Sequence, residues 1–130
     1  MVIYPELTEP QVDRIFHALA DSTRRDIIRR TLEGEASVSE LAAAYLMSFA
    51  AVSKHVAVLE GAGLVTKEPR GRERIVRGNP EQIRRAQVLL DRYEQVWRAR
   101  ISRLDSLLAE NPNEDLVSGA LELAARLRHG

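Results

Sequence analysis

Two short helices joined by a tight turn are predicted for residues 39–63, and this stretch constrains the fold more than any other part of the sequence. Ser48 is predicted to start the second helix as its N-cap, because a serine hydroxyl there accepts a hydrogen bond from a free backbone amide. Apolar residues recur at helical spacing, so each helix has one buried side. These sides are predicted to comprise Leu41, Ala44, Tyr45 and, left open, Ala42 in the first helix, and Val52, Val56 and Leu59 in the second.

The other side of the second helix carries small and positively charged residues. Ser53, Lys54 and Ala57 point away from the apolar side by helical geometry. Small side chains allow a close approach to a phosphate-lined groove, and a positive charge favours it. This pattern is typical of a helix-turn-helix whose second helix, called the reader helix below, contacts DNA. Ser48 and Ser53 are the first candidates for contacts, and Lys54 is expected to supply charge.

A β-hairpin is predicted directly after the reader helix, with strands at residues 64–68 and 73–77 and a turn at residues 69–72. From Lys67 to Arg77 there are five basic and two acidic residues, a local charge of +3 in a chain whose net charge is zero. A charged hairpin alone can be a solvated surface, but beside a helix-turn-helix it favours a wing that contacts DNA. The predicted wing contacts are Arg70, Arg72 and Arg74.

Two helices are predicted before the helix-turn-helix. A capping box at Thr8 and Gln11 starts the first, which ends near Ala20, and Asp21 caps the second, which ends at residues 33–34. The second helix carries four arginines, for which a solvated face paired with aspartates is the main interpretation and phosphate contact the alternative. The predicted buried residues are Val12, Ile15, Phe16 and Leu19 in the first helix and Ile27, Ile28 and Leu32 in the second.

A helix of nearly thirty residues is predicted between Asn79-Pro80 and Asn111-Pro112. Its apolar residues step by three or four, close to a heptad seam. A rod of about 42 Å is longer than one small core needs. It is therefore predicted to pack against the same helix of a second copy, and folding back over its own domain is the alternative. The predicted dimer contacts are Leu90, Tyr93, Trp97, Ile101, Leu104 and Leu108.

The length of 130 residues predicts one winged-helix domain. Residues 8–78 are expected to hold the helices, helix-turn-helix and wing, residues 79–110 the dimerisation helix, and residues 111–130 an accessory helix whose role is left open. The fold class is thus mainly α with a small β-hairpin. No segment resembles a signal peptide, and the longest apolar run, residues 41–52, is shorter than the ~20 residues of a membrane span. A cytoplasmic protein without membrane contact is expected.

A catalytic or cofactor site is not predicted. The chain has no cysteine and no glycine-rich phosphate loop, and Ser53 and His55 are two residues apart on a helix and do not face each other. The chain is expected not to be an enzyme and to need no cofactor. His55 lies about 60° from the middle of the buried stripe, so helical geometry alone leaves it between the core boundary and the DNA-facing side.

Six short segments follow one another within residues 15–104, the part of the chain considered next: ALADSTRR (18–25), SVSELA (37–42), MS (47–48), AVSKH (51–55), VLEGAGLV (58–65) and GRER (71–74). With them, roughly two thirds of the chain resembles the ArsR family of winged-helix bacterial repressors. The resemblance implies a homodimer on an inverted-repeat operator, with reader helices in successive major grooves of double-stranded DNA and wings beside them. It also favours His55 as a DNA contact.

Two departures from the family pattern bear on mechanism. Metal sensors of the family often carry a Cys-Val-Cys pair where this chain has Ser37-Val38-Ser39, and hydroxyls do not hold soft metals. Others bind zinc through Asp and His on the long helix, but no histidine lies between His55 and His129. The chain is therefore predicted to belong to a metal-independent branch. Phe49-Ala50 replaces a common polar-proline pair, and Phe49 is expected to pack beneath the helix start, with a thymine methyl contact as the alternative.

Two other functions are kept open. A winged helix can bind a protein instead of DNA, although Lys54, Ala57 and the arginine-rich wing are unusual for that role. A repressor could also respond to an unidentified small apolar effector near Tyr93 and Trp97, but these aromatics suit a dimer interface equally well.

Overall fold

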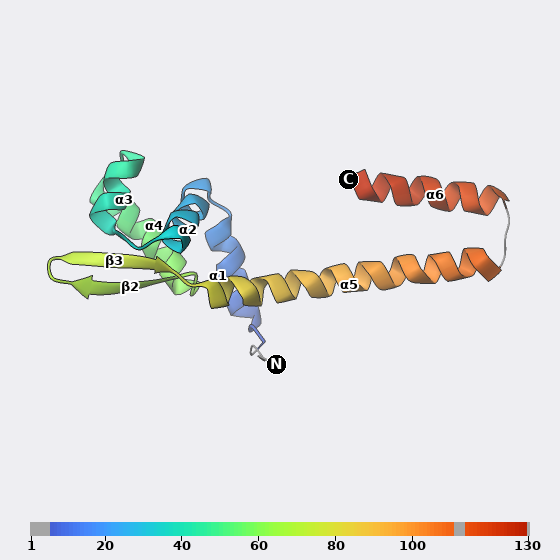
Figure 1. Ribbon diagram of the computed structural model, residues 1–130, viewed down its shortest axis with the longest axis horizontal. Helices are drawn as coiled ribbons and strands as arrows, with labels where there is room; N and C mark the ends of the chain where they lie inside the picture. The colour runs from blue at the N-terminus through green and yellow to red at the C-terminus, as the bar shows by residue number, and fades with distance from the viewer. Residues whose placement is uncertain (1–5, 111–113, 130) are drawn as a thin grey trace. The chain divides into compact units, whose positions relative to one another are not determined.

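A computed structural model describes residues 6–110 and 114–129 of the chain. Its contacts divide the chain into two units, residues 1–88 and residues 89–130, which are described separately. In chain order the elements are α1 (Glu9–Leu19), α2 (Ser22–Glu33), β1 (Ala36–Ser37), α3 (Val38–Tyr45), α4 (Phe49–Gly61), β2 (Val65–Arg70), β3 (Glu73–Gly78), α5 (Pro80–Glu110) and α6 (Glu114–His129) (Figure 1).

The helix starts follow from local capping chemistry. Thr8 and Gln11 form the predicted capping box of α1, with the Thr8 amide donating to Gln11 Oε1 at 2.8 Å. Asp21 caps α2 by accepting from the Arg24 amide at 3.0 Å, and Ser48 caps α4. These three predicted caps are confirmed. A further capping box, in which Ser37 and Glu40 start α3, places that helix one residue earlier than the predicted stretch.

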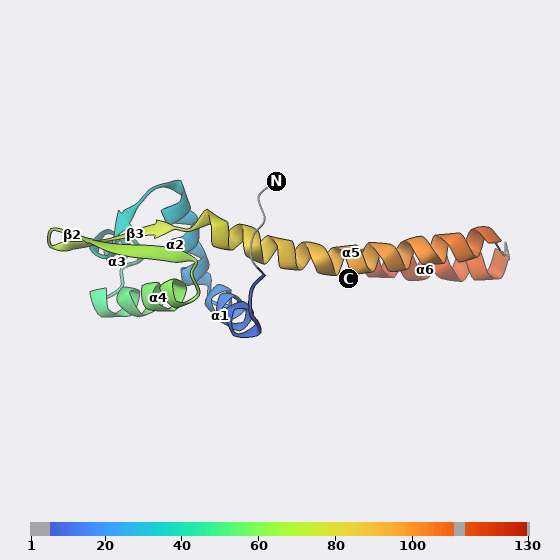
Figure 2. The ribbon, with the colours of Figure 1, turned by 90° about the horizontal axis from the view of Figure 1, so that it is seen from below.

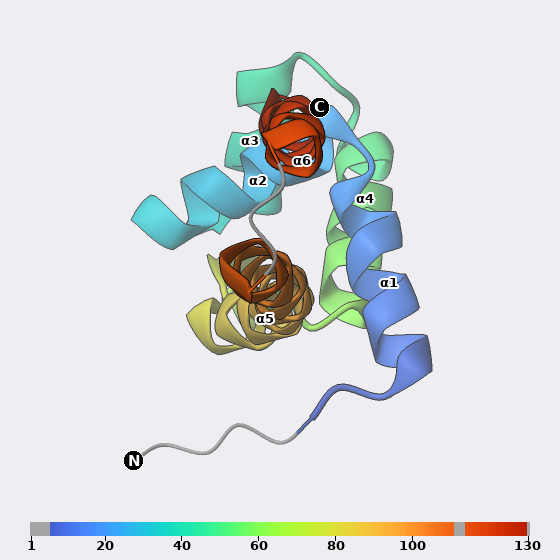
Figure 3. The same cartoon turned by 90° about the vertical axis from the view of Figure 1, so that its right-hand side faces the viewer.

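The core of the first unit is formed by side chains of α1 to α4 and of the strands β2 and β3, and within it α1, α2 and α4 contact one another (Figure 3). The predicted stripe of α4 is confirmed, because Val52, Val56 and Leu59 are each 0% exposed. Three predicted core positions are wrong. Phe16, Leu32 and Ala44 are exposed. Ala42, whose burial was left open, is buried in α3, and Thr31 is buried in α2. The remaining core side chains of this unit include Ile15, Ile27, Leu41, Leu64 and Val76.

The predicted hairpin is formed by β2 and β3, which pair antiparallel from Val65 opposite Gly78 to Arg70 opposite Glu73 (Figure 2). The turn is shorter than predicted, since β2 continues to Arg70 and leaves only Gly71 and Arg72 between the strands. Gly71 has a φ of +62°, which glycine adopts without strain. The short strand β1, which was not predicted, pairs with β3, so the sheet order is β1-β3-β2. The mainly α fold with a small hairpin is confirmed as a winged helix-turn-helix.

The long helix α5 is continuous from Pro80 to Glu110, as predicted (Figure 1). In the isolated chain Leu90 and Tyr93 are 51% and 62% exposed, while Trp97, Ile101 and Leu108 are partly buried. In the described part of the chain no single helix is long and apolar enough to cross a membrane; α3 and α4 pass that test by length and composition only when joined across their 115° bend.

Candidate nucleic-acid interface

The reader helix α4 is oriented by its buried stripe, and its other side is open. Ser48, Lys54 and Ala57 are exposed and Ser53 is partly exposed, all on the side away from the core. The Ser48 hydroxyl accepts a hydrogen bond from the Ala51 amide at 3.1 Å. Helix geometry leaves the first amides of α4 without intrahelical acceptors. The amino-terminal end of this helix therefore offers donors and a positive dipole end to an anion.

The turn before the reader helix adopts an unusual backbone. Leu46 ends α3 in the left-handed region, with a φ of 54°, and its side chain is 94% exposed. The amide of the next residue, Met47, donates to the Ala42 carbonyl at 3.1 Å, and the Met47 side chain packs against the core. Phe49, the first residue of α4, is 54% exposed. The expectation that Phe49 packs beneath the helix start is wrong, since its side chain is largely exposed and is not among the residues packed against the core.

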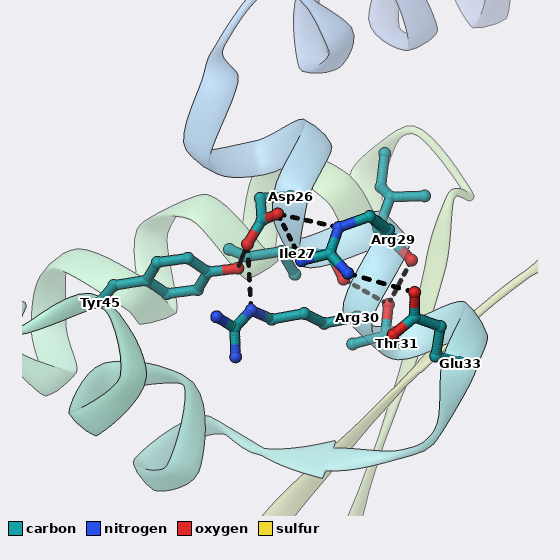
Figure 4. Close-up of polar contacts among 8 residues, drawn as sticks. Asp26, Ile27, Arg29, Arg30, Thr31, Glu33 and Tyr45 are labelled. Carbon is teal, nitrogen blue, oxygen red and sulfur yellow. Dashed lines mark hydrogen bonds and ion pairs between the residues drawn. The ribbon is translucent and has the colours of Figure 1, made fainter.

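A polar clamp holds α3 against α2 just before this turn (Figure 4). The Tyr45 hydroxyl donates to Asp26 Oδ2 at 2.5 Å, and the Arg30 guanidinium lies over the Tyr45 ring, 5.0 Å from its centroid. Arg29 and Arg30 also donate to Asp26, at 2.8 and 3.0 Å. The Tyr45 hydrogen bond and the two arginines hold the pKa of Asp26 well below its usual range. Burial, together with the bond to Asp26, raises the pKa of Tyr45 to about 12.

This clamp decides how two of the four arginines of α2 are used. Arg29 and Arg30 pair with Asp26, as the solvated-face interpretation predicted. Arg24 and Arg25 belong to the same predicted face, but their guanidinium groups donate to carbonyls at the end of α1, Arg24 to Ala18 at 2.9 Å and Arg25 to Leu19 at 2.6 Å. Arg24 and Arg25 therefore join α2 to α1, whereas Arg29 and Arg30 make their ion pairs within α2.

His55 faces the start of α2. Its Nδ1 lies 3.5 Å from Arg24 Nη1 and 3.9 Å from Asp21 Oδ2, and its side chain is 22% exposed. The amide of Arg24 and the charges of Arg24 and His55 lower the pKa of Asp21. One ring nitrogen of His55 is thus engaged inside the protein.

The wing arginines divide into two kinds. Arg70 donates to Glu35 at 2.7 Å and to Glu68 at 3.0 Å, and Arg77 donates to the same Glu35 at 2.8 Å. Hydrogen bonds from Arg70 and Arg77 lower the pKa of Glu35 from 4.5 to about 2. Arg72 and Arg74 are exposed, and within the described residues neither makes an ion pair. The sequence pattern could not separate these kinds, because Glu35 is distant in the chain.

A buried junction joins the end of the reader helix to the start of α5. Gln82 is 6% exposed, and its Nε2 donates to the Ala62 carbonyl at 2.9 Å. Asn79 Nδ2 donates to the Gly63 carbonyl at 2.9 Å. Gly63 has a φ of +75°, and a Cβ there would lie 3.0 Å from Gln82 Nε2. Both the backbone conformation and the limited space therefore favour glycine at this position. The apolar periodicity of α5 gave no signal for Gln82.

Side chains that could bind a metal ion are spread over the described part of the chain. Across residues 6–110 and 114–129, no three His, Cys, Asp or Glu side chains come close enough to hold a metal ion. Ser37 and Ser39 lie at the start of α3, and the Ser37 hydroxyl accepts from the Glu40 amide at 3.0 Å.

Comparisons with known proteins agree with this geometry. Residues 21–67 match the family model for bacterial regulatory proteins of the arsR family. The chain is 41% identical over 81 residues to the HTH-type transcriptional regulator Rv2034 of Mycobacterium tuberculosis, covering 62% of this chain and 76% of that protein.

Solved structures give the same picture. An ArsR family transcriptional regulator, RHA00566, is 32% identical, with a TM-score of 0.67 over 72% of this chain and 97% of that one. A domain of Mycobacterium bovis described as a homodimeric winged helix-turn-helix is 22% identical, with a TM-score of 0.55 over 72% of this chain and 92% of that one, and supports the fold alone.

Proposed function

The chain belongs to the ArsR family of bacterial regulatory proteins and is a transcriptional regulator, and from this premise we propose that it is a homodimeric repressor that binds a specific DNA sequence. The observation that carries the proposal is the open side of α4. Fully buried Val52, Val56 and Leu59 fix the orientation of this helix, so that its small and basic residues and its free amides face outward together.

The proposed contacts follow from which side chains are free to make them. Ser48 and Ser53 contact the groove at the start and middle of the reader helix, and the small Ala57 lets the helix approach. Lys54, Arg72 and Arg74 neutralise phosphates, since they are exposed and make no ion pair within the described residues. Arg70 and His55 are secondary contacts, because each must first leave a partner inside the chain.

The proposed dimer is formed by α5, through Leu90, Tyr93, Trp97, Ile101, Leu104 and Leu108. Leu90 and Tyr93, which remain 51% and 62% exposed on this long helix, support a partner of the same kind. A dimer with two-fold symmetry presents two equivalent reader helices, so its operator is an inverted repeat. Metal does not act as the effector, since serines replace the thiolates that a soft metal requires.

A small apolar effector is a second candidate. The second unit contains a pocket of about 230 Å³ between α5 and α6, lined mainly by Trp97, Ile101, Leu104, Leu123 and Leu127. A ligand in this pocket would contact residues assigned to the dimer interface, so binding would shift the monomer-dimer equilibrium.

Selection of duplexes from a random pool, followed by binding measurements at increasing salt, tests the proposal. Three phosphate contacts per protomer give six per dimer, so the logarithm of the affinity should fall with a slope of about −5 against the logarithm of salt concentration. The affinity should then drop roughly 10³-fold between about 50 and 200 mM salt.

The selected sequences should be inverted repeats, and the protein should sediment as a dimer. A monomer that binds no duplex in dilute buffer would refute the proposal. A salt-independent complex with another protein would favour the protein-interaction alternative.

A further inference from the structure

We propose that Phe49 recognises thymine, by placing its exposed ring against a thymine 5-methyl group in the major groove; this inference rests on the proposed DNA-binding function. Phe49 is the first residue of the reader helix, directly after the Ser48 cap. In docked helix-turn-helix proteins the amino-terminal residues of this helix reach the base edges.

The fold does not account for the position of this ring. Phe49 is 54% exposed and is absent from the residues that pack against the core, whereas the adjacent Met47 does pack there. An exposed aromatic side chain contributes little to folding, because most of its apolar surface stays in contact with water. A contact with another molecule would bury this surface and stabilise the complex.

The preceding turn gives a second, independent observation. Leu46 is 94% exposed and has a φ of 54°, a region that costs a residue with a Cβ roughly 1 kcal/mol and that glycine adopts freely. The chain thus keeps an exposed apolar side chain on a left-handed backbone three residues before Phe49. Both apolar side chains therefore lie at the same end of the reader helix, beside the Ser48 cap and the free amides.

The chemistry of the groove limits what an apolar group can read there. Base edges in the major groove present hydrogen-bond donors and acceptors, and the thymine 5-methyl is their apolar group. Phe49 cannot donate or accept a hydrogen bond through its side chain. Its ring therefore distinguishes thymine from cytosine by contact with the methyl group. The neighbouring Ser48 hydroxyl accepts from the Ala51 amide and keeps its own hydrogen to donate to the DNA.

The test replaces thymine by deoxyuridine, which pairs identically but lacks the methyl group. A duplex selected from a random pool is synthesised with each thymine replaced in turn, and its affinity for the protein is measured by fluorescence anisotropy. Removing one buried methyl group should weaken binding about 4-fold, which corresponds to ~0.8 kcal/mol. At least one position should show this effect.

Variants of the protein then assign the effect to Phe49. Phe49→Ala should bind the thymine and deoxyuridine duplexes equally, whereas Phe49→Leu should retain part of the preference. Phe16→Ala is the matched control, since Phe16 is also a half-exposed phenylalanine but lies on α1, and it should keep the full effect. Far-UV circular dichroism checks that each variant is folded.

The possible results are distinct. If the protein binds its selected duplex but no replacement changes the affinity, if that duplex has no thymine, or if Phe49→Ala keeps the methyl dependence, the assignment of Phe49 is overturned and the proposed function stands. If the protein binds no duplex at all, the proposed function fails and the assignment fails with it.

Discussion

Replacing Gln82 by leucine should destabilise the first unit through the junction between α4 and α5. Gln82 is 6% exposed and donates to the carbonyl of Ala62, the residue that ends the reader helix and is itself 4% exposed. Leucine has a similar size but no donor, so this carbonyl loses its side-chain donor in a region with little access to water. Losing a hydrogen bond to a buried group costs roughly 1–3 kcal/mol, and we expect about 2 kcal/mol.

Urea denaturation at a fixed protomer concentration measures this effect, because the stability of a dimer depends on concentration. With a slope of about 1.5 kcal/mol per molar urea, the substitution should lower the midpoint by about 1.3 M. Gln87→Leu is the matched control, since Gln87 lies on the same helix but is exposed and should change stability by less than about 0.5 kcal/mol. Equal midpoints for the two variants would show that the Gln82 hydrogen bond does not hold the junction.

Three further predictions concern the wing and the dimer. Arg72→Ala should reduce the slope of log affinity against log salt concentration by about 0.9 for each phosphate that the variant no longer neutralises. Arg70→Ala should reduce this slope by less, because Arg70 is already paired with Glu35. Equal changes in slope would contradict the division of the wing arginines. Trp97→Glu should convert the dimer to a monomer in sedimentation, whereas Gln95→Glu, which adds the same charge outside the seam, should not. The lowered pKa of Glu35 contributes stability that is present above pH 4.5 and is lost as the pH falls toward about 2, so Glu35→Gln should reduce the acid sensitivity of unfolding; an unchanged pH profile would remove the Glu35 pairing as its cause.

Much of the fold could be predicted from the sequence because its signals are local. The caps at Thr8, Asp21 and Ser48 depend on hydrogen bonds that span three residues, and all three are present. The buried stripe of α4 depends on helical periodicity, and the span of α5 on periodicity together with the Asn-Pro signal at each end; both agree with the structure.

The errors occurred where periodicity does not specify which neighbour a residue meets. Phe16 and Leu32 lie next to true core positions along their helices, but no element of the first unit covers them fully. Thr31 takes the buried place beside Leu32, because its hydroxyl can donate to the Ile27 carbonyl at 2.7 Å within its own helix. Burial of a polar residue with its own local acceptor cannot be read from hydrophobic spacing.

The sequence by itself determined the order of elements, the reader helix and the basic wing, because each depends on contacts between residues that are close along the chain. Only the tertiary structure decided which charged groups remain free. Glu35 lies 35 residues before Arg70 in the sequence and forms an ion pair with it, whereas Arg72 has no ion-pair partner in the described residues. The strength of an ion pair depends on distance in space, and the folded backbone alone sets that distance.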